Sequence, residues 1–369
     1  MSSAARVLEP ARSARWEGVG GPFRVIETPL PQVLGDGEVL VEVELATVCG
    51  SDLHTVTGDR PGPAPGVLGH EQVGRVVAVG PGAPRCLDST PVAPGLRVVW
   101  SVAASCLRCA RCRAGMPQKC LHLRKYGHEA WDEESPLRGG FATHCLLLPG
   151  TAIAAIDESV PAEVAAPVSC ATATVAAAVG AAGPVDQGTR ALVNGAGMLG
   201  LTAVAMLSAA GARVVVVDPH PERRAHALRF GATEAQPVGA PIGDCDVALE
   251  LSGAPEAVQA CLDSLSVGGV AVLAGSVSPG PAVRLDPERL VRGLHRIVGV
   301  HNYHPRDLQV AVDFITEHHR SRPFAELVAG RHRLDELDAA FAAARRGEAP
   351  RQAVAPLVRT GRPRPRPTA

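Results

Sequence analysis

The sequence lacks an excess of charge of either sign. Its 36 Lys and Arg residues balance 37 Asp and Glu residues, which gives a formal net charge of -1 over 369 residues. This balance argues against a protein that binds nucleic acid through a broad basic surface. With 46% hydrophobic and 20% charged residues, the composition is that of a folded globular chain rather than a disordered one.

Long hydrophobic runs are also missing. No apolar stretch approaches the roughly 20 residues that a membrane-spanning helix needs. The first residues, MSSAARVLEPARSARW, carry arginines without the apolar core of a secretory signal. We therefore expect a cytoplasmic protein without a membrane or nucleic-acid partner. The length predicts two domains.

Ten cysteines do not fit a set of disulfides in such a chain, because a large core needs no covalent staples and the cytosol is reducing. Four of them fall within fifteen residues: Cys106, Cys109, Cys112 and Cys120. Thiolates at this spacing can surround a tetrahedral zinc and leave no position for a substrate, which predicts a structural zinc site. An iron–sulfur cluster is the main alternative.

The hydrophobic pattern changes near residue 162. Before it, alternating residues at 38–46 and 74–80 predict half-buried strands separated by Gly and Pro. After it, short apolar runs alternate with helical segments, which predicts βαβ units, a parallel sheet covered on both faces and an α/β fold. Two amphipathic helices follow residue 302, and the basic residues 360–369 are expected to form a frayed tail.

A glycine-rich turn follows the apolar run at 191–193 and precedes a helical segment. It reads Gly195-Ala196-Gly197-Met198-Leu199-Gly200. In this context Gly195 permits a tight turn, Gly197 leaves room for a pyrophosphate at the helix N-terminus, and Gly200 allows close packing. We predict a dinucleotide site that also includes Met198 and Leu199; a glycine-rich turn in another α/β fold is the alternative.

The choice of dinucleotide depends on the end of the next strand. Asp218 follows Gly200 by 18 residues, and its carboxylate would accept hydrogen bonds from the adenosine ribose hydroxyls. A carboxylate there repels a ribose phosphate, which favours NAD over NADP. Arg223 and Arg224 stand nearby and keep NADP open as an alternative.

Further candidate metal ligands are dispersed: Cys49 in VCGSDLH, His70 and Glu71 in GHE, and Cys170 in APVSCATAT. Each alone is more often an ordinary buried residue than a ligand. In this order, and with the four-cysteine motif and the glycine-rich turn, they resemble the zinc-containing medium-chain alcohol dehydrogenases. The resemblance covers nearly the whole chain. It implies a GroES-like, β-rich catalytic domain over 1–171, completed by 302–369, and a Rossmann domain over 172–301.

The same resemblance implies roles for individual residues. Cys49, His70 and Cys170 match the ligands of a catalytic zinc, and Glu71 matches an acid that lies behind the metal and can exchange onto it. Ser51 and His54 match a proton relay, and Asp52 matches an acid that supports the ligands. Backbone groups of Ala274 to Ser276 and of Val298 to Val300 would hold the nicotinamide carboxamide.

Arg351 matches a late cofactor-binding arginine of the family, with an ordinary surface arginine as the alternative. A zinc with three protein ligands and one open position lowers the pKa of an alcohol, so that hydride can pass to the nicotinamide. The expected activity is that of an NAD-dependent alcohol dehydrogenase with two zinc ions per subunit. The family forms dimers and tetramers, so we expect a homo-oligomer.

The substrate is indicated least clearly. Segment 123–144 contains Arg124, Lys125, His128 and Glu129, and it is either a solvated surface loop or a place where cations meet an anionic substrate. Stretches such as KYGHE and GVHNYHPRDL resemble the phosphonate-metabolism-associated branch of the family, which implies a hydroxyalkylphosphonate or its aldehyde. His301, Asn302 and Tyr303 could also reach the cleft.

Two alternative functions remain. A polyol or sugar-alcohol dehydrogenase would share this chemistry and differ in its pocket. A catalytically silent NAD-binding scaffold or sensor belongs to another class and would need neither the ligands nor the relay residues. Four further cysteines have no assigned role, and a small buried hydrophobic residue is the default for each: Cys86, Cys145, Cys245 and Cys261.

Overall fold

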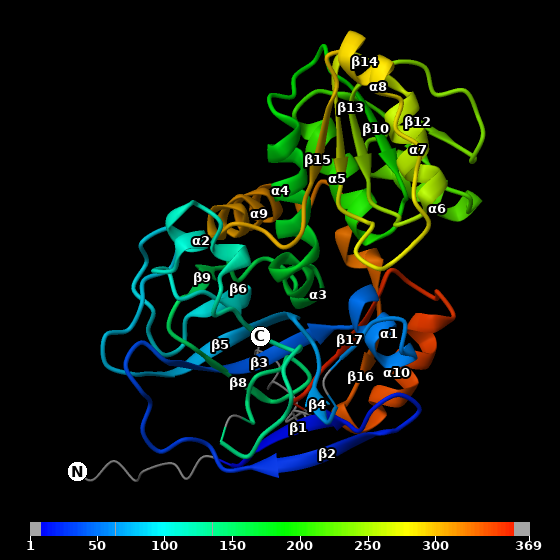
Figure 1. Ribbon diagram of the computed structural model, residues 1–369. Coiled ribbons are helices and arrows are strands. Elements are labelled where there is room, and N and C mark those ends of the chain that lie inside the picture. The colour runs from blue at the N-terminus through cyan, green and yellow to red at the C-terminus, as the bar shows by residue number, and fades with distance from the viewer. Residues whose placement is uncertain (1–8, 63, 135, 358–369) are drawn as a thin grey trace, which may run out of the picture.

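The computed structural model describes residues 9–62, 64–134 and 136–357. Three sheets organise this part of the chain, with six, eight and three strands. Figure 1 shows the six-stranded sheet in the upper part of the molecule and the other two sheets in the lower part. The basic tail predicted at 360–369 lies outside the described residues.

The six-stranded sheet is parallel throughout, in the order β12-β11-β10-β13-β14-β15. Counted along the chain this is the order 3-2-1-4-5-6 of a dinucleotide-binding sheet, which confirms the predicted βαβ alternation. Its strands are β10 (Arg190–Asn194), β11 (Arg213–Val217), β12 (Glu234–Gln236), β13 (Cys245–Glu250), β14 (Leu265–Leu273) and β15 (Arg296–Gly299). Its helices are α5 (Met198–Ala209), α6 (Pro221–Arg229), α7 (Pro255–Asp263) and α8 (Pro287–Arg292).

The near-continuous apolar sequence of these strands follows from burial of both faces of the sheet. Along β10, Ala191 and Val193 enter one hydrophobic core while Leu192, between them, enters another. All three side chains are fully buried. Successive side chains of a strand point to opposite faces, so a sheet covered on both sides needs apolar residues at every position.

The eight-stranded sheet runs in the order β16-β17-β3-β5-β6-β7, with β8 on β3 and β9 on β6. The predicted strands at 38–46 and 74–80 are β3 and β5, and β5 begins earlier, at Glu71. The sheet strands are β3 (Val39–Thr47), β5 (Glu71–Val79), β6 (Arg97–Ala104), β7 (Arg124–Lys125), β8 (His144–Leu147), β9 (Thr151–Ala155), β16 (Val328–His332) and β17 (Arg351–Val354). The small sheet has β1 (Ala11–Trp16), β2 (Phe23–Thr28) and β4 (Gly66–Val67).

The end of the chain returns to the eight-stranded sheet. Strand β17 pairs antiparallel with β3, with Ala353 opposite Thr47. Helix α9 (Pro305–His318) packs on α4 (Ala171–Ala182) and β9. This is the first of the two amphipathic helices predicted after residue 302, and its apolar residues Leu308, Val312 and Ile315 are buried. The domain bounds at 171 and 301 stay a prediction.

The remaining helical elements are short and lie at turns or at the ends of strands. They are α1 (Gly50–Thr57), α2 (Ala110–Arg113), η1 (Pro117–Lys119), α3 (Ala162–Ala165), η2 (Ala166–Ser169), η3 (Phe324–Leu327), η4 (Leu334–Glu336) and α10 (Leu337–Arg345). Within the described ranges, no single helix is long and apolar enough to cross a bilayer. One bent pair, residues 162–169 with 171–182, reaches that length and composition.

Candidate active site

Three segments that are far apart in the sequence bring Cys49, His70 and Cys170 together. Their ligand atoms, two thiol sulfurs and an imidazole nitrogen, all lie within 4.8 Å of one another. Cys49 precedes α1, His70 precedes β5, and Cys170 precedes α4. Two sulfur ligands and one nitrogen ligand suit zinc, and three protein ligands leave a fourth position for a substrate oxygen.

Asp52 holds two of these ligands in place. Its Oδ2 accepts a hydrogen bond from the backbone N–H of Cys49 at 3.0 Å, and its Oδ1 lies 3.3 Å from Nδ1 of His70. A carboxylate beside Nδ1 would favour a proton on that nitrogen and leave Nε2 for the metal. Burial opposes the charged imidazole, but Asp52 more than offsets this and raises the pKa of His70.

One of the two cysteines of this cluster, Cys49, lies in an environment that favours metal binding. The pKa of Cys49 is lowered well below the usual thiol value, first by a hydrogen bond from Cys170 and, against the effect of burial, by the charges of Arg351 and His70. Since the thiolate is the form that binds zinc, this environment favours the ligand state.

A buried ion pair lies directly behind the cluster. Arg351 donates from Nε and Nη2 to the two carboxylate oxygens of Glu71, at 2.6 and 2.8 Å, and Thr47 donates to the same carboxylate at 2.7 Å. Nη2 of Arg351 also lies 3.6 Å from Sγ of Cys49. Burial raises the pKa of Glu71 to about 7, and Arg351 opposes this rise. The surface-arginine alternative for Arg351 is therefore wrong; its contact with a cofactor stays a prediction.

The predicted relay residues lie along one cavity. Ser51 Oγ is 3.1 Å from Nε2 of His70, and both Ser51 and His54 line the cavity. The His54 side chain is 50% exposed, and its Nδ1 lies 3.5 Å from Oδ2 of Asp59. Ser51 is thus beside the ligand cluster and His54 is open to water, as a proton path between them requires.

The four-cysteine loop forms a second, separate cluster. Cys106, Cys109, Cys112 and Cys120 have their sulfurs within 4.8 Å of one another, with individual separations of 3.4 to 3.8 Å. Four sulfurs at about 2.3 Å from one zinc would stand about 3.8 Å apart. This spacing fits one ion and leaves no room between the sulfurs for an iron–sulfur cluster. Backbone N–H groups of Leu121 and Cys112 lower the pKa of Cys109 to about 6.

The glycine-rich turn has the geometry that its sequence predicts. Gly195 has φ of +96°, and a Cβ on Gly200 would stand 1.7 Å from the carbonyl oxygen of Gly195. Around Gly197 no atom lies within 4 Å of an added Cβ. The first and third glycines are therefore required by packing, and the space at Gly197, beside the N-terminus of α5, fits a dinucleotide pyrophosphate.

Asp218 stands at the end of β11 beside this turn. It is buried, its Oδ2 accepts from the N–H of Ala196, and its Oδ1 accepts from the N–H of His220, both at 2.8 Å. Oδ2 keeps a second lone pair for a ribose hydroxyl, whereas Oδ1 also lies 3.0 Å from Nδ1 of His220. Arg224 donates to the carbonyl oxygens of Asp218 and Pro219. Arg223 is half-buried, with no hydrogen bond recorded for its side chain.

The other predicted cofactor residues lie at the carboxyl ends of β14 and β15. Ala274 and Val300 line the cavity, as does Leu199 of the glycine-rich turn. Ser276 donates instead to the buried carboxylate of Glu250, at 3.1 Å. Val298 is half-buried within β15, and Met198 is buried at the start of α5.

Sequence reasoning did not identify Glu250. Its second oxygen accepts from Ser252 and from the N–H of Gly253, so it ties together the loops after β13 and β14. The signal that could have identified it is its place in the sequence, since Glu250 is an acid directly after the apolar residues Val247 to Leu249. Tyr303 was predicted only as a cleft residue, but its hydroxyl also bonds to the backbone of Ser169, beside Cys170, and of Val102.

The cavity itself has a volume of about 230 Å³, and its wall includes residues of the eight-stranded sheet and residues that follow strands of the six-stranded sheet. The metal-ligand cluster is at one side, and Leu199, Ala274 and Val300 of the parallel-sheet half are at another. Arg60 and Lys125 also line it, together with several histidines. Among the described residues that line the cavity, none is Asp or Glu. Its wall is therefore positive although the whole chain is close to neutral.

Segment 123–144 contributes to the cavity in part. Lys125 and His128 line the cavity, whereas Arg124 is half exposed and pairs with Glu129. Glu129 accepts hydrogen bonds from Arg124, from the N–H of Lys125 and from Arg138. The surface-loop interpretation thus holds for Arg124, and the cleft interpretation holds for Lys125 and His128.

The residues that follow β15 also reach the cavity. So does Arg60, a cation that sequence reasoning did not identify. His301, Asn302 and Tyr303 all line it. Arg60 follows α1 and Gly58, whose φ of +86° turns the chain out of the helix. Its N–H donates to the carbonyl of His54. Closeness to the relay helix was the signal that could have identified Arg60.

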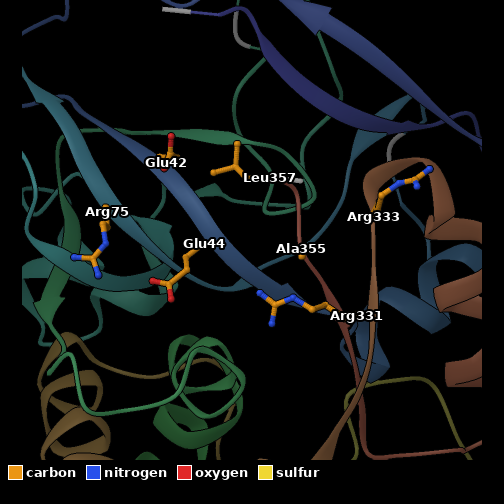
Figure 2. Close-up of a pocket in the computed structure, with 7 residues that line it drawn as sticks. All are labelled: Glu42, Glu44, Arg75, Arg331, Arg333, Ala355 and Leu357. Atoms are coloured by element: carbon orange, nitrogen blue, oxygen red, sulfur yellow. The ribbon is translucent and has the colours of Figure 1, made fainter. Parts of the chain in front are cut away.

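Another hollow, of about 470 Å³, is shown in Figure 2. It is lined by Glu42, Glu44, Arg75, Arg331, Arg333, Ala355 and Leu357. Its arginines already pair with acids: Arg75 with Glu158, Arg331 with Glu163, and Arg333 with Asp335. None of the described residues that line it carries a thiol, an imidazole or a hydroxyl, so this lining is unsuited to the predicted chemistry.

The four cysteines without an assigned role are buried and form no disulfide. Burial raises the pKa of Cys86 and Cys245 to about 11 and that of Cys261 to about 12, and it also raises the pKa of Cys145. They remain thiols at neutral pH and are unsuited to metal binding in this state.

Comparisons with known proteins agree with this geometry. The family model for the alcohol dehydrogenase GroES-like domain matches residues 35–158, and that for zinc-binding dehydrogenase matches residues 199–317. Geraniol dehydrogenase of Castellaniella defragrans is 30% identical over 372 residues, which covers 92% of this chain and 96% of that protein.

Two solved structures show the same architecture. An alcohol dehydrogenase from Thermotoga maritima is 27% identical with a TM-score of 0.88, over 94% of this chain and 99% of that chain. A zinc-binding dehydrogenase from Sinorhizobium meliloti bound to NADP is 26% identical with a TM-score of 0.82, over 95% and 100%. With a relative matched almost from end to end, the chain belongs to the zinc-dependent medium-chain alcohol dehydrogenases, oxidoreductases that use zinc and a nicotinamide cofactor.

Proposed function

We propose that this dehydrogenase acts on an alcohol that carries an anionic group, and on the matching aldehyde or ketone. The observation that supports this is the charge of the cavity wall: Arg60 and Lys125 line it, and none of its described lining residues is acidic. Cationic side chains in a partly buried site bind phosphonate or phosphate oxygens through charge-assisted hydrogen bonds. A hydroxyalkylphosphonate, such as hydroxyethylphosphonate, fits both the charge and the chemistry.

In this proposal Cys49, His70 and Cys170 hold the catalytic zinc, and the four-cysteine loop holds a structural zinc. The catalytic zinc supplies Lewis acidity, which lowers the pKa of an alcohol and polarises a carbonyl. Ser51, beside His70, would accept the hydroxyl proton, and His54 would pass it to water. Glu71 and Arg351 would determine the electrostatic environment behind the ligands. Glu71 would also be able to exchange onto the metal as a ligand.

For the cofactor, we propose that the turn at Gly195 to Gly200 holds the pyrophosphate and that Asp218 binds the adenosine ribose. Oδ2 of Asp218 accepts from the N–H of Ala196 within the turn, and a carboxylate at this place supports NAD over NADP. Arg224 is occupied by two backbone carbonyls, and this lowers its availability for a ribose phosphate. Backbone groups near Ala274 and Val300, both on the cavity wall, would orient the nicotinamide.

We also propose that the protein is a homo-oligomer and that it is cytoplasmic. A homo-oligomer is supported by the outer strand of the parallel sheet, β15, and by exposed apolar side chains near it, since Val291 and Leu294 are each 70% exposed. A cytoplasmic location is supported by ten cysteines without a disulfide. Size-exclusion chromatography with light scattering would test the first.

A neutral polyol is the second candidate substrate, and His128 favours it. Its Nδ1 lies 2.9 Å from the carbonyl oxygen of Tyr126, which can only accept, so Nδ1 carries the proton and Nε2 is an acceptor. A second substrate hydroxyl could donate to Nε2. A silent NAD-binding scaffold is opposed by the complete set of ligand and relay residues.

The test is a comparison of initial rates of NADH formation on protein verified to contain zinc, with hydroxyethylphosphonate, ethanol, benzyl alcohol and a polyol. We expect the highest kcat/KM for the phosphonate. Turnover of neutral alcohols alone would leave the family assignment intact and reject the anionic substrate. The Cys49→Ala variant is the control, because it should lose turnover and still bind NADH.

A further inference from the structure

The four-cysteine loop contacts the substrate cavity through one side chain. Lys119 lies at the end of the turn η1, immediately before the ligand Cys120, and its Nζ donates to Nδ1 of His301 at 2.5 Å. His301 lines the cavity and follows the last strand of the parallel sheet. A residue of the metal-binding loop thus meets a residue 182 positions away at the mouth of the active site.

This contact determines which nitrogen of His301 carries the proton. An ammonium group has donors only, so Nδ1 of His301 must accept. Burial, followed by the charges of Lys119, Lys125 and Arg60, lowers the pKa of His301 to about 4, and the ring is therefore neutral near pH 7. Its single proton is on Nε2, which leaves His301 with an N–H donor for a ligand. His128 is held in the opposite tautomer by Tyr126.

Among the described residues, no Asp or Glu forms an ion pair with Lys119, Lys125 or Arg60. The chain contains two lysines, Lys119 and Lys125; the second lines the cavity, and the first contacts a residue that does. Glu129 is the nearby acid, but its carboxylate accepts from Arg124 and Arg138 and from the backbone of Lys125. An anion that enters from solvent would reduce the repulsion among Lys119, Lys125 and Arg60.

We infer that Lys119, His301 and Lys125 form the anion-binding end of the substrate site, with Lys119 as the residue that determines specificity for a charged substrate. This inference rests on the proposed function and assigns its charge recognition to the four-cysteine loop. Lys119 lies in the turn η1 of that loop. Lys125 lies in β7, directly after the loop, where it is paired with Ala103 of β6. The loop is thus a wall of the substrate site as well as a metal site.

The test compares Lys119→Met with Arg113→Met, which removes an exposed cation from helix α2 of the same loop. Each zinc-loaded variant is assayed with hydroxyethylphosphonate and with benzyl alcohol, and ethylphosphonate is tested as a competitive inhibitor of benzyl alcohol oxidation. We expect Lys119→Met to raise the KM for the phosphonate and the inhibition constant of ethylphosphonate by about tenfold, because a charge-assisted contact is lost. Arg113→Met should leave both constants, and the kcat for benzyl alcohol, within about twofold of the wild-type values.

Zinc content and melting temperature should be the same in both variants, and a Lys119→Arg variant should regain part of the phosphonate affinity. Equal phosphonate constants for Lys119→Met and Arg113→Met would overturn the inference. If the wild type oxidises only neutral alcohols but ethylphosphonate still inhibits it through Lys119, the proposed substrate fails and the anion site stands. If ethylphosphonate does not inhibit the wild type, the anion site fails as well.

Discussion

The buried pair of Arg351 and Glu71 allows a quantitative prediction. The two side chains are 7% and 0% exposed, and two N–H···O contacts of 2.6 and 2.8 Å join them. Replacing Arg351 by Met would leave a buried carboxylate without its cation. Breaking a buried pair in this way costs about 3–5 kcal/mol, a large part of a total stability of about 5–15 kcal/mol.

For a chain of this size, about 2 °C per kcal/mol is a reasonable conversion, so Arg351→Met should lower the melting temperature of the zinc-loaded protein by about 6–10 °C. Differential scanning calorimetry at pH 7.5 would measure this. The double variant Arg351→Met with Glu71→Gln should recover most of the loss, because no buried charge remains.

Arg331→Met is the matched control. Arg331 pairs with Glu163 at 2.9 Å, but their side chains are 62% and 32% exposed. Exposed pairs contribute about 0–1 kcal/mol, so this variant should melt within about 2 °C of the wild type. If Arg351→Met melts as Arg331→Met does, or if the double variant is no more stable than the single one, the argument from an unpaired buried charge is refuted.

Three further predictions follow from the same site. Asp52→Asn should weaken zinc binding at the three-ligand site by about 10–100-fold, while the four-cysteine site keeps its ion; two unchanged affinities in a chelator competition would contradict the role of Asp52. Asp218→Ala should reduce the preference for NAD in the ratio of kcat/KM for NAD and NADP, and an unchanged ratio would exclude a ribose contact. Burial, then the charges of Arg60 and Lys119, lower the pKa of Lys125, so the KM for hydroxyethylphosphonate should rise at a lower alkaline pH than an exposed lysine would give. Lys125→Arg should flatten this rise, and identical pH profiles for the two proteins would contradict it.

The features that were predicted correctly have short-range patterns. Backbone geometry alone requires glycine at Gly195 and at Gly200, and both requirements act within one turn. The four cysteines of the metal loop lie within fifteen residues, so the chain between them can only form a compact loop. The strands of the parallel sheet are short, continuous apolar runs separated by helical segments, and this pattern is visible without a partner strand.

The residues that were missed or placed incompletely depend on long-range packing. Arg351 and Glu71 are 280 positions apart, and Lys119 and His301 are 182 apart. In the sequence each is an ordinary charged or polar residue, since nothing local indicates a partner. Arg60 was missed for the same reason, because its place on the cavity wall depends on how the rest of the chain surrounds the relay helix.

The sequence by itself therefore predicted the α/β class, the dinucleotide turn and the metal loop from residue type and spacing, and the dispersed candidate zinc ligands from their resemblance to a family. Tertiary structure decided what surrounds them. It paired Glu71 with Arg351, split segment 123–144 into surface and cavity residues, and left Lys125 and Arg60 on a wall without acids among the described lining residues. The charge of a cavity is a sum over side chains from distant segments, and only the folded chain brings those segments to one place.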